Sequence, residues 1–522
     1  MREKSGRFAI HGGRSWATAW VLALPLLGCA GASTLNDADA QATLNDRGAS
    51  DREVDGATPI GAEPVSATIA DAPEPAPRER GVTAVNGFEK IYLKPDIKSP
   101  LIGLFRAGQT VPFANPEPMK GPGVGLCKGG FYAVKPRGFV CVTASSTLDP
   151  DDPRALAAAE VLPDSSQPMP FKVGVMMASS PQYTRIPTPE EQHAEEKDLD
   201  KWLALLQSGK VPEGPGKPDA SPAGHGPSPR VAQYLEAVKP GLKSEEDAYE
   251  ARKMAFVGEI DAAGRTFLLT PDLTFVPKDK VRFVDAPRLE GVDLTKSELK
   301  FPFAYAWIGD AAKLKKSDSG FVETGDAWPR QSFLQIEGQL VQGRGGPYWK
   351  TADGTYVRND QITIFKRRTD RPKGVGPKDK WIDVRITWGT LVAYEGDTPI
   401  FATAVSPGQD GITARSNGHN TARGLQSVGW KLLSADMSGV EKNKPWAVDE
   451  VPFVAYYKDS FALHGAWWHD DFGRPKSHGC VNIAPTDARR LFNWMEPGMP
   501  KGWYAVAAYY PDVRGTVIDI RP

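Results

Sequence analysis

Residues 461–482 read FALHGAWWHDDFGRPKSHGCVN, and this stretch decides what the C-terminal part of the chain can be. It combines an apolar run that leads into His464 with a Gly-rich segment that contains Cys480. A cysteine becomes a strong nucleophile when its pKa falls or when a base lies within hydrogen-bond reach, and an imidazole provides both effects. We therefore expect a strand bearing His464 and a loop bearing Cys480, which together form a thiolate–imidazolium pair.

The residues around Cys480 support this interpretation. Gly479 permits a close approach of backbone at the nucleophile, and the amide of Cys480 with its neighbours is placed to stabilise an oxyanion. A helix signal follows at once, with Pro485 at its first position and Pro497-Gly498 at its end. Its apolar face is expected to hold the cysteine loop from behind, through Ala488, Leu491, Phe492 and Met495.

Cysteine usage singles out the same thiol. The chain has four cysteines, Cys29, Cys127, Cys141 and Cys480. Cys127 and Cys141 flank a turn signal at Lys135-Pro136-Arg137-Gly138, so two antiparallel strands could bring them within bonding distance outside the cytoplasm. Two separate buried thiols are the alternative. With Cys29 assigned below, Cys480 remains an unpaired and therefore candidate catalytic thiol.

The first thirty residues predict export. Arg2, Lys4, Arg7 and Arg14 precede an apolar run over 16–27, too short to span ~30 Å of hydrocarbon comfortably. The run closes on Leu26-Leu27-Gly28-Cys29-Ala30, which resembles a lipobox and makes Cys29 the expected lipidation site; an ordinary signal peptide is the alternative. Residues 1–29 are thus expected to be the signal. The polar segment 30–82 is expected to be a disordered tether that links the folded modules to the lipid anchor. This anchor would hold the protein in the cell envelope, at the outer membrane in a diderm host.

Composition points to several mainly β modules with short helices. The chain has 522 residues, which is too long for a single hydrophobic core. Its net charge of -1 provides no long-range electrostatic field that would attract nucleic acid. Short strand-like runs predict a small β-barrel at 83–150, similar to bacterial Src-homology-type modules. A repeat with an offset of 81 links residues 270–281 to 351–362 and predicts two related β modules at 165–290 and 295–368. An amphipathic helix is expected within 192–210, in the first of these two modules.

The motif Ser477-His478-Gly479-Cys480-Val481-Asn482, preceded by Leu463-His464-Gly465, resembles the signature of the L,D-transpeptidase (YkuD-type) catalytic domain. The resemblance covers about 379–511, including an opening hairpin over 381–394 that turns into a strand over 400–406. One departure is visible. Thr421-Ala422-Arg423-Gly424 keeps the Thr and Gly of a family segment but lacks its Pro and its aromatic residue, which affects the expected substrate groove.

The resemblance implies a mainly β catalytic domain that acts on peptidoglycan stem peptides through a cysteine acyl-enzyme, without metal or cofactor. By position Cys480 is the nucleophile, His464 its base, and His478 a second site histidine. A backbone carbonyl near Gly465 would orient the His464 ring, and Gly479 belongs to the nucleophile loop. The substrate contacts that we expect are Ser477, Asn482, Trp467 and Tyr456.

Alternatives stay open at this point. A zinc site built from His464, His469, His478 and Cys480 matches no common ligand spacing. The acyl acceptor is an amine of a neighbouring stem, water (an L,D-carboxypeptidase) or a wall-attached protein. The alternative outside the enzymes is a non-catalytic lipoprotein that binds the cell wall through its β modules.

Overall fold

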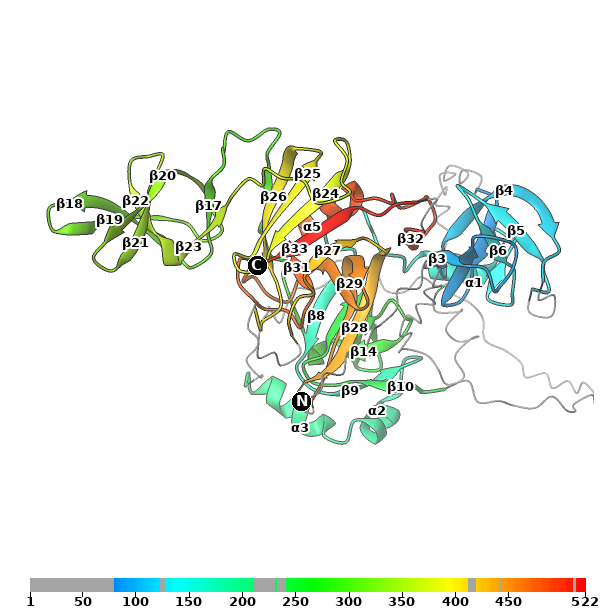
Figure 1. Cartoon of the computed structure of the whole chain (residues 1–522). Coiled ribbons are helices and arrows are strands. Elements are labelled where there is room, and N and C mark those ends of the chain that lie inside the picture. The colour runs from blue at the N-terminus through cyan, green and yellow to red at the C-terminus, as the bar shows by residue number, and fades with distance from the viewer. Residues whose placement is uncertain are drawn as a thin grey trace, which may run out of the picture. The chain divides into compact units, whose positions relative to one another are not determined.

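The computed structural model describes residues 79–122, 127–210, 231, 241–411, 419–441, 444–509 and 513–522, all within one compact unit, Arg78–Pro522 (Figure 1). The chain is mainly β, as predicted. In this described part no helix has the length and apolarity needed to cross a membrane. The expected signal at 1–29 with Cys29, and the tether up to residue 78, lie outside the described residues.

The first module is built from seven strands: β1 Gly81–Ala84, β2 Phe88–Tyr92, β3 Leu101–Arg106, β4 Thr110–Met119, β5 Phe131–Val134, β6 Phe139–Cys141 and β7 Ser146–Thr147. Neighbouring strands within the module pair antiparallel, including β1 with β4, β2 with β3 and β5 with β6. Val82, Ile91, Ile102, Phe105 and Val111 are fully buried between them. The likeness to a Src-homology-type barrel stays a prediction.

Cys127 and Cys141 form a disulfide in this module, with their Cα atoms 5.3 Å apart. Cys141 ends β6 opposite Phe131, and both cysteines belong to one buried cluster with that residue. The bridge closes a loop across a separation of 14 residues. In a chain-entropy treatment a loop of this size stabilises the folded state by about 3 kcal/mol.

Replacing both Cys127 and Cys141 by serine is therefore expected to lower the stability of the first module by about 3 kcal/mol. Limited proteolysis of the full chain with mass mapping should show faster cleavage within 79–147 in the variant. Cleavage within the C-terminal domain serves as the internal control and should keep its rate. Equal protection of 79–147 in both proteins would contradict a stabilising bridge.

The second module contains helices α1 Pro153–Ala159, α2 Pro189–Glu195 and α3 Leu199–Gln207, and strands β8 Lys172–Met176, β9 Ser180–Tyr183, β10 Lys243–Ala248, β11 Lys253–Phe256, β12 Gly258–Ala262, β13 Arg265–Leu269, β14 Phe275–Pro277 and β15 Val281–Phe283. Five strands form a sheet in the order β10-β9-β14-β13-β12. The short amphipathic helix expected within 192–210 is present as α3, with Leu199 and Trp202 buried, and α2 is an additional helix before it. The Thr188 side chain and Glu191 form a capping box that starts α2 before the predicted stretch, and the chain breaks at Glu196 before α3.

The third module is a seven-stranded sheet in the order β19-β18-β22-β21-β20-β17-β23. Its strands are β17 Phe303–Ala306, β18 Ala311–Ser317, β19 Gly320–Trp328, β20 Phe333–Gly343, β21 Gly346–Thr351, β22 Tyr356–Arg358 and β23 Ile362–Phe365. The repeat is visible as structure. The 3-10 turns η1 Lys278–Lys280 and η2 Asn359–Gln361 follow β14 and β22, and each leads into the next strand at the same offset.

The C-terminal domain contains β24 Lys380–Arg385, β25 Thr390–Glu395, β26 Thr398–Ser406, β27 Gly424–Ser427, β28 Trp430–Glu441, β29 Lys444–Lys458, β30 Phe461–Gly465, β31 Val481–Ile483, α5 Pro485–Trp494, β32 Ala505–Ala507 and β33 Val517–Arg521. The short strand β16 Val292–Asp293 pairs with β26. The predicted opening hairpin is present as β24 and β25, followed by β26. β33 lies beyond the expected limit at 511 and still pairs parallel with β24, so the sheet continues to residue 521.

The helix after the cysteine is present and buries the predicted face. Ala488, Leu491 and Phe492 of α5 are at most 3% exposed, and Met495 follows the helix. They pack on Phe453 and Leu463 of β29 and β30, within one apolar cluster. The core therefore fixes α5 against the strand that carries His464.

Candidate active site

The pairing of β30 with β31 places the two predicted catalytic side chains. These strands run parallel, with Leu463 opposite Val481 and His464 opposite Asn482. Continuing this register by one residue puts Cys480 beside Ala462, two residues before His464 on the same strand. Cys480 is the residue before β31, so the pairing brings the segment that contains the thiol next to the strand that carries His464.

His464 is oriented by its own backbone. The ring nitrogen Nδ1 lies 3.1 Å from the carbonyl oxygen of Gly465, as the sequence predicts. When Nδ1 donates its proton there, Nε2 carries none and is free to accept one. The ring also stacks against Trp468, with centroids 5.8 Å apart. Gly465 itself is confined, because a Cβ there would come within 2.8 Å of Pro452 Cγ.

The cysteine loop is closed by Ser477. Its hydroxyl donates to the carbonyl of Cys480 over 2.5 Å and accepts from the amide of Gly479 at 3.0 Å. Gly479 has a φ of +134°, and a Cβ at this position would lie 2.8 Å from Cε1 of Phe461. Only glycine fits both requirements. Ser477 is 5% exposed, so its hydroxyl holds the loop and is turned away from open solvent.

The pKa shifts of the two candidate catalytic groups favour their neutral forms, in contrast to the expected thiolate–imidazolium pair. Cys480 is half-buried as a residue, and burial raises the pKa of its thiol to about 11, against the opposing effect of a hydrogen bond with the backbone of Ala462. Burial likewise lowers the pKa of His464 to about 4. The thiol donates weakly to the Ser460 carbonyl at 3.7 Å. The proton therefore rests on sulfur, and the neutral imidazole is ready to take it.

These pKa shifts predict how Cys480 reacts with an alkylating agent. Only the thiolate alkylates, so the rate constant with iodoacetamide should rise about tenfold per pH unit from pH 6 to pH 10, without a plateau. Peptide mapping separates adducts on Cys480 from those on Cys29. A plateau above pH 7 would instead show that the sulfur is already ionised by an imidazolium.

His478 turns outward and belongs to a second cluster. Its Nε2 lies 3.1 Å from Oε2 of Glu441, and its ring stacks on Trp446 with centroids 4.7 Å apart. His419 meets the ring edge at 4.9 Å. Glu441 and Trp446 come from the β28–β29 hairpin, about 35 positions before the motif, so no local pattern could have linked them to His478. The hairpin and the cysteine loop are thus in contact.

Asn482 and the two tryptophans occupy different environments. Asn482 is 2% exposed, and its Nδ2 lies 2.9 Å from Nε2 of His469, whose pKa burial lowers to about 4. Trp467 is 1% exposed and packs in the apolar cluster around Val451 and Ala505. Trp467 is therefore enclosed, whereas Trp468 is half-buried beside the His464 ring. Of the two, Trp468 is the one available to a groove.

Tyr456 lies next to the thiol and is half-buried. Burial raises the pKa of its phenol to about 12, and the negative charge of an ionised Cys480 raises it further. The phenol therefore stays protonated across the physiological range and is able to donate a hydrogen bond. Among the four expected substrate contacts, it is the one that combines nearness to Cys480 with partial exposure.

Elements outside the motif hold the loop in place. Thr421, from the segment that departs from the family pattern, is buried, and its hydroxyl accepts from the amide of Gly408 at 2.7 Å. Gly408 bridges to Ser477, so Thr421 supports the loop from the opposite side. Ala484 gives α5 no side-chain cap. Asp487 in its first turn accepts from Thr403 and from the amide of Gly291.

The geometry gives no support for a zinc centre. His478 pairs with Glu441, and His469 with Asn482, so these rings do not converge with Cys480 on one point. Within the described ranges, no group of three His, Cys, Asp or Glu side chains is arranged to hold a metal ion.

The fold and the site together define a mainly β domain in which a free thiol precedes β31 and a buried imidazole lies on the paired strand β30. Residues 379–502 match the family model of the L,D-transpeptidase (YkuD) catalytic domain. This part of the chain is therefore an L,D-transpeptidase catalytic domain. The match begins at the residue before β24 and ends before β32.

Several solved structures are similar to this chain. The NMR structure of the catalytic domain of the E. faecium L,D-transpeptidase is 19% identical, with 27% of this chain and 97% of that chain covered and a TM-score of 0.21. The L,D-transpeptidase from Mycobacterium smegmatis is 15% identical, with 46% and 89% covered and a TM-score of 0.22. L,D-transpeptidase 3 from Mycobacterium tuberculosis is 15% identical, with 41% of this chain and 83% of that chain covered and a TM-score of 0.21. At such scores the family model alone carries the assignment. No curated protein matches the chain.

Proposed function

We propose that the protein is a peptidoglycan L,D-transpeptidase that cross-links stem peptides through an acyl-enzyme on Cys480. The observation that carries the proposal is the parallel pairing of β30 with β31, because it supports a thiol at Cys480, just before β31, next to the strand that bears His464. The buried, neutral imidazole supports it further, because a general base must be unprotonated to act.

In the acylation step, Nε2 of His464 takes the proton from the Cys480 thiol as sulfur attacks the carbonyl of the third stem residue. The carbon–sulfur bond forms and the carbon–nitrogen bond to the terminal D-Ala breaks. His464 returns its proton to the departing amine. The amide of Cys480, the residue before β31, donates to the oxyanion that develops.

In the second step an amine of a neighbouring stem attacks the thioester. It loses a proton to His464, forms the new amide, and releases sulfur, which regains the proton. With water in place of the amine, the same step yields a trimmed tripeptide. The Phe461 ring packs against Gly479, which supports a fixed position of the cysteine loop during both steps.

The test uses the full chain with disaccharide-tetrapeptide muropeptides and mass analysis of the products. Cross-linked dimers with release of D-Ala support transpeptidation, and trimmed monomers alone assign the acceptor as water. Ertapenem, which acylates the E. faecium catalytic domain, serves as an independent probe of the thiol. The absence of both products, together with the absence of an ertapenem adduct on Cys480, would contradict the proposal.

We also propose that this reaction takes place in the cell envelope, on a protein held by lipid at Cys29. The N-terminal signal and the disulfide outside the active site support an oxidising compartment. Radiolabelled palmitate incorporation that disappears in Cys29→Ala checks the anchor.

A further inference from the structure

A tryptophan-lined hollow lies beside the loop that leads to the active site. It has a volume of about 450 Å³, and both the third module and the catalytic domain contribute to its wall. Trp307 and Trp349 come from the third module, and Trp388 comes from the turn between β24 and β25. All three indoles are half-buried, so each presents part of its surface to the hollow.

Polar groups on the rim are held in fixed positions. The indole N–H of Trp349 donates to Oδ1 of Asn359 at 2.8 Å, which orients both side chains and turns the amide NH₂ of Asn359 away from that bond. The hydroxyl of Thr363 donates to the carbonyl of Trp388 at 3.0 Å, so its oxygen keeps lone pairs for an acceptor role. Arg474 lies over the Trp307 ring, 3.7 Å from its centroid, and fixes that plane.

The hollow is coupled to the catalytic loop. Gly473, Arg474 and Pro475 line it, and the chain continues from them directly into Ser477 and Cys480. From Pro475 to Cys480 the backbone can span at most about 18 Å. Arg330 pairs with Asp470 at 2.7 Å, and the side chain of Gln331 donates to the Asp470 carbonyl at 3.1 Å. The third module thereby holds the start of the same loop.

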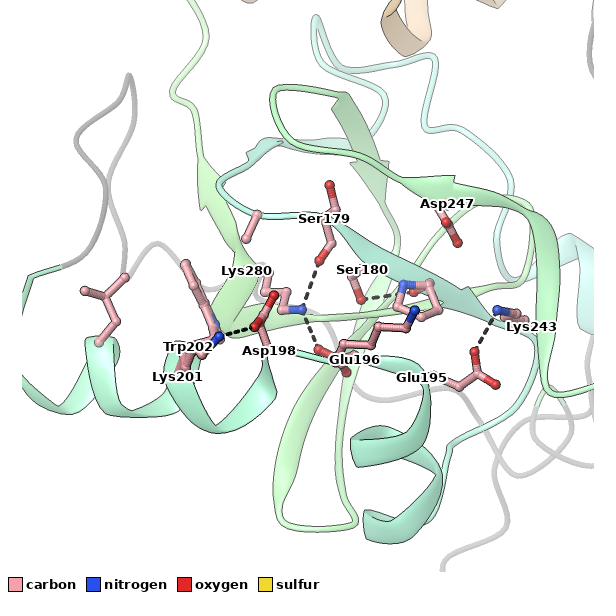
Figure 2. A pocket seen from close by; sticks show the side chains of 14 residues that line it. Ser179, Ser180, Glu195, Glu196, Asp198, Lys201, Trp202, Lys243, Asp247 and Lys280 are labelled. Carbon is pink, nitrogen blue, oxygen red and sulfur yellow. Dashed lines mark hydrogen bonds and ion pairs between the residues drawn. The ribbon is translucent and has the colours of Figure 1, made fainter.

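Another hollow, of about 480 Å³, lies in the second module and has a different character (Figure 2). Its ionic side chains pair with one another: Lys280 with Glu196, Lys201 with Asp198, and Lys243 with Glu195. Figure 2 shows Lys280 lying between Glu196 and Ser179. Its polar groups satisfy each other, whereas the tryptophan-lined hollow combines aromatic faces with oriented hydrogen-bonding groups.

We infer that the tryptophan-lined hollow binds a glycan built of N-acetylated pyranose sugars. A pyranose ring has an apolar C–H face that stacks on indole, and its rim of hydroxyl and acetamide groups needs both donors and acceptors. These hydrogen-bond donors and acceptors are supplied by Asn359, Thr363 and Lys366. The inference rests on the proposed function in one respect: the bound glycan would be the strand that bears the reacting stem peptides, held within reach of Cys480.

Binding is tested on the full chain by calorimetry with N-acetylglucosamine oligomers as the probe. We expect Trp349→Ala to weaken binding at least tenfold. Thr387→Trp, which adds bulk from an exposed position on the rim, should weaken it similarly without removing any packed side chain. Trp328→Ala is the matched control, since Trp328 is a half-buried tryptophan of the same module outside the hollow. No binding by the wild type, or equal binding by all four proteins, would overturn the inference.

Turnover separates this inference from the proposed function. With insoluble glycan-linked peptidoglycan as substrate, Trp349→Ala and Thr387→Trp should lower the rate about fivefold or more. With a free tetrapeptide the rates should match the wild type, and so should ertapenem acylation of Cys480. Glycan binding without any turnover in the wild type would overturn the proposed function and leave the glycan site standing. Equal turnover of polymer by all proteins would overturn the coupling of that site to catalysis.

Discussion

Cys480→Ala is expected to abolish formation of cross-linked dimers, release of D-Ala and acylation by ertapenem, with a loss of at least about 10⁴-fold in rate. The reason is chemical. Cys480 is the free cysteine among the described residues, and its sulfur is the atom that the acyl group must reach. The nearby Ser477 offers no comparable nucleophile, because its hydroxyl is hydrogen-bonded to the carbonyl of Cys480 within the loop.

Cys480→Ser is the matched control for the structural role of this position. The hydroxyl can keep a hydrogen bond to Ser460, so the loop should retain its conformation, but a hydroxyl is a weaker nucleophile than a thiol beside the same base. We expect it to be nearly as inactive as Cys480→Ala and to unfold at the wild-type temperature. Dimers formed by either variant at the wild-type rate would refute the acyl-enzyme.

The choice of base needs a second comparison, because burial lowers the pKa of His464 and of His469 to about 4 alike. Their positions separate them: His464 lies on β30, which pairs with the strand directly after Cys480, whereas His469 contacts Asn482. His464→Gln should therefore lose about 10²–10⁴-fold in the acylation rate constant. His469→Gln should lose less than tenfold. The opposite ranking would transfer the role of base to His469.

Lys431→Met is expected to lower the free energy of unfolding of the catalytic domain by about 3 kcal/mol, because it leaves buried carbonyls without donors. Lys431 of β28 is fully buried, and its ammonium donates to the carbonyls of Phe492, Met495 and Pro497 at 2.5, 2.7 and 2.8 Å. These carbonyls end α5, where the helix has no partners of its own. The same ammonium lies 4.4 Å from the centroid of Phe492.

Lys380→Met is the matched control for this prediction. Lys380 donates to the carbonyl of Trp494 at the same helix end, but its side chain is 30% exposed and water can replace it. The Lys380→Met substitution should lower the free energy of unfolding by less than about 1 kcal/mol. Thermal unfolding followed by calorimetry should show a midpoint lower by roughly 5–10 °C for Lys431→Met and little change for Lys380→Met. Equal midpoints for the two variants would show that burial of the Lys431 ammonium contributes nothing.

Local chemistry explains why so much of the site could be predicted. Positive φ at Gly479, the Pro485 helix start and the apolar face of α5 are all encoded within a few residues, so the sequence displays them directly. The carbonyl partner of His464 is its own neighbour, Gly465, and is equally local. The amphipathic helix expected within 192–210 is confirmed as α3, whereas α2 was missed because the periodicity of apolar residues does not register the capping box at Thr188.

The sequence by itself determined the family, the nucleophile loop, the mainly β class and the cysteine that remains unpaired, because each depends on residue types at short spacing. Only the tertiary structure decided the charge state of the thiol and imidazole, since desolvation depends on what packs around both groups. It also determines that His478 contacts Glu441 and Trp446, and that Lys431 donates to carbonyls at the end of α5. The same is true of the hollow that three distant tryptophans line together. Such contacts arise from strands far apart in the chain, and no local pattern records which of them become neighbours.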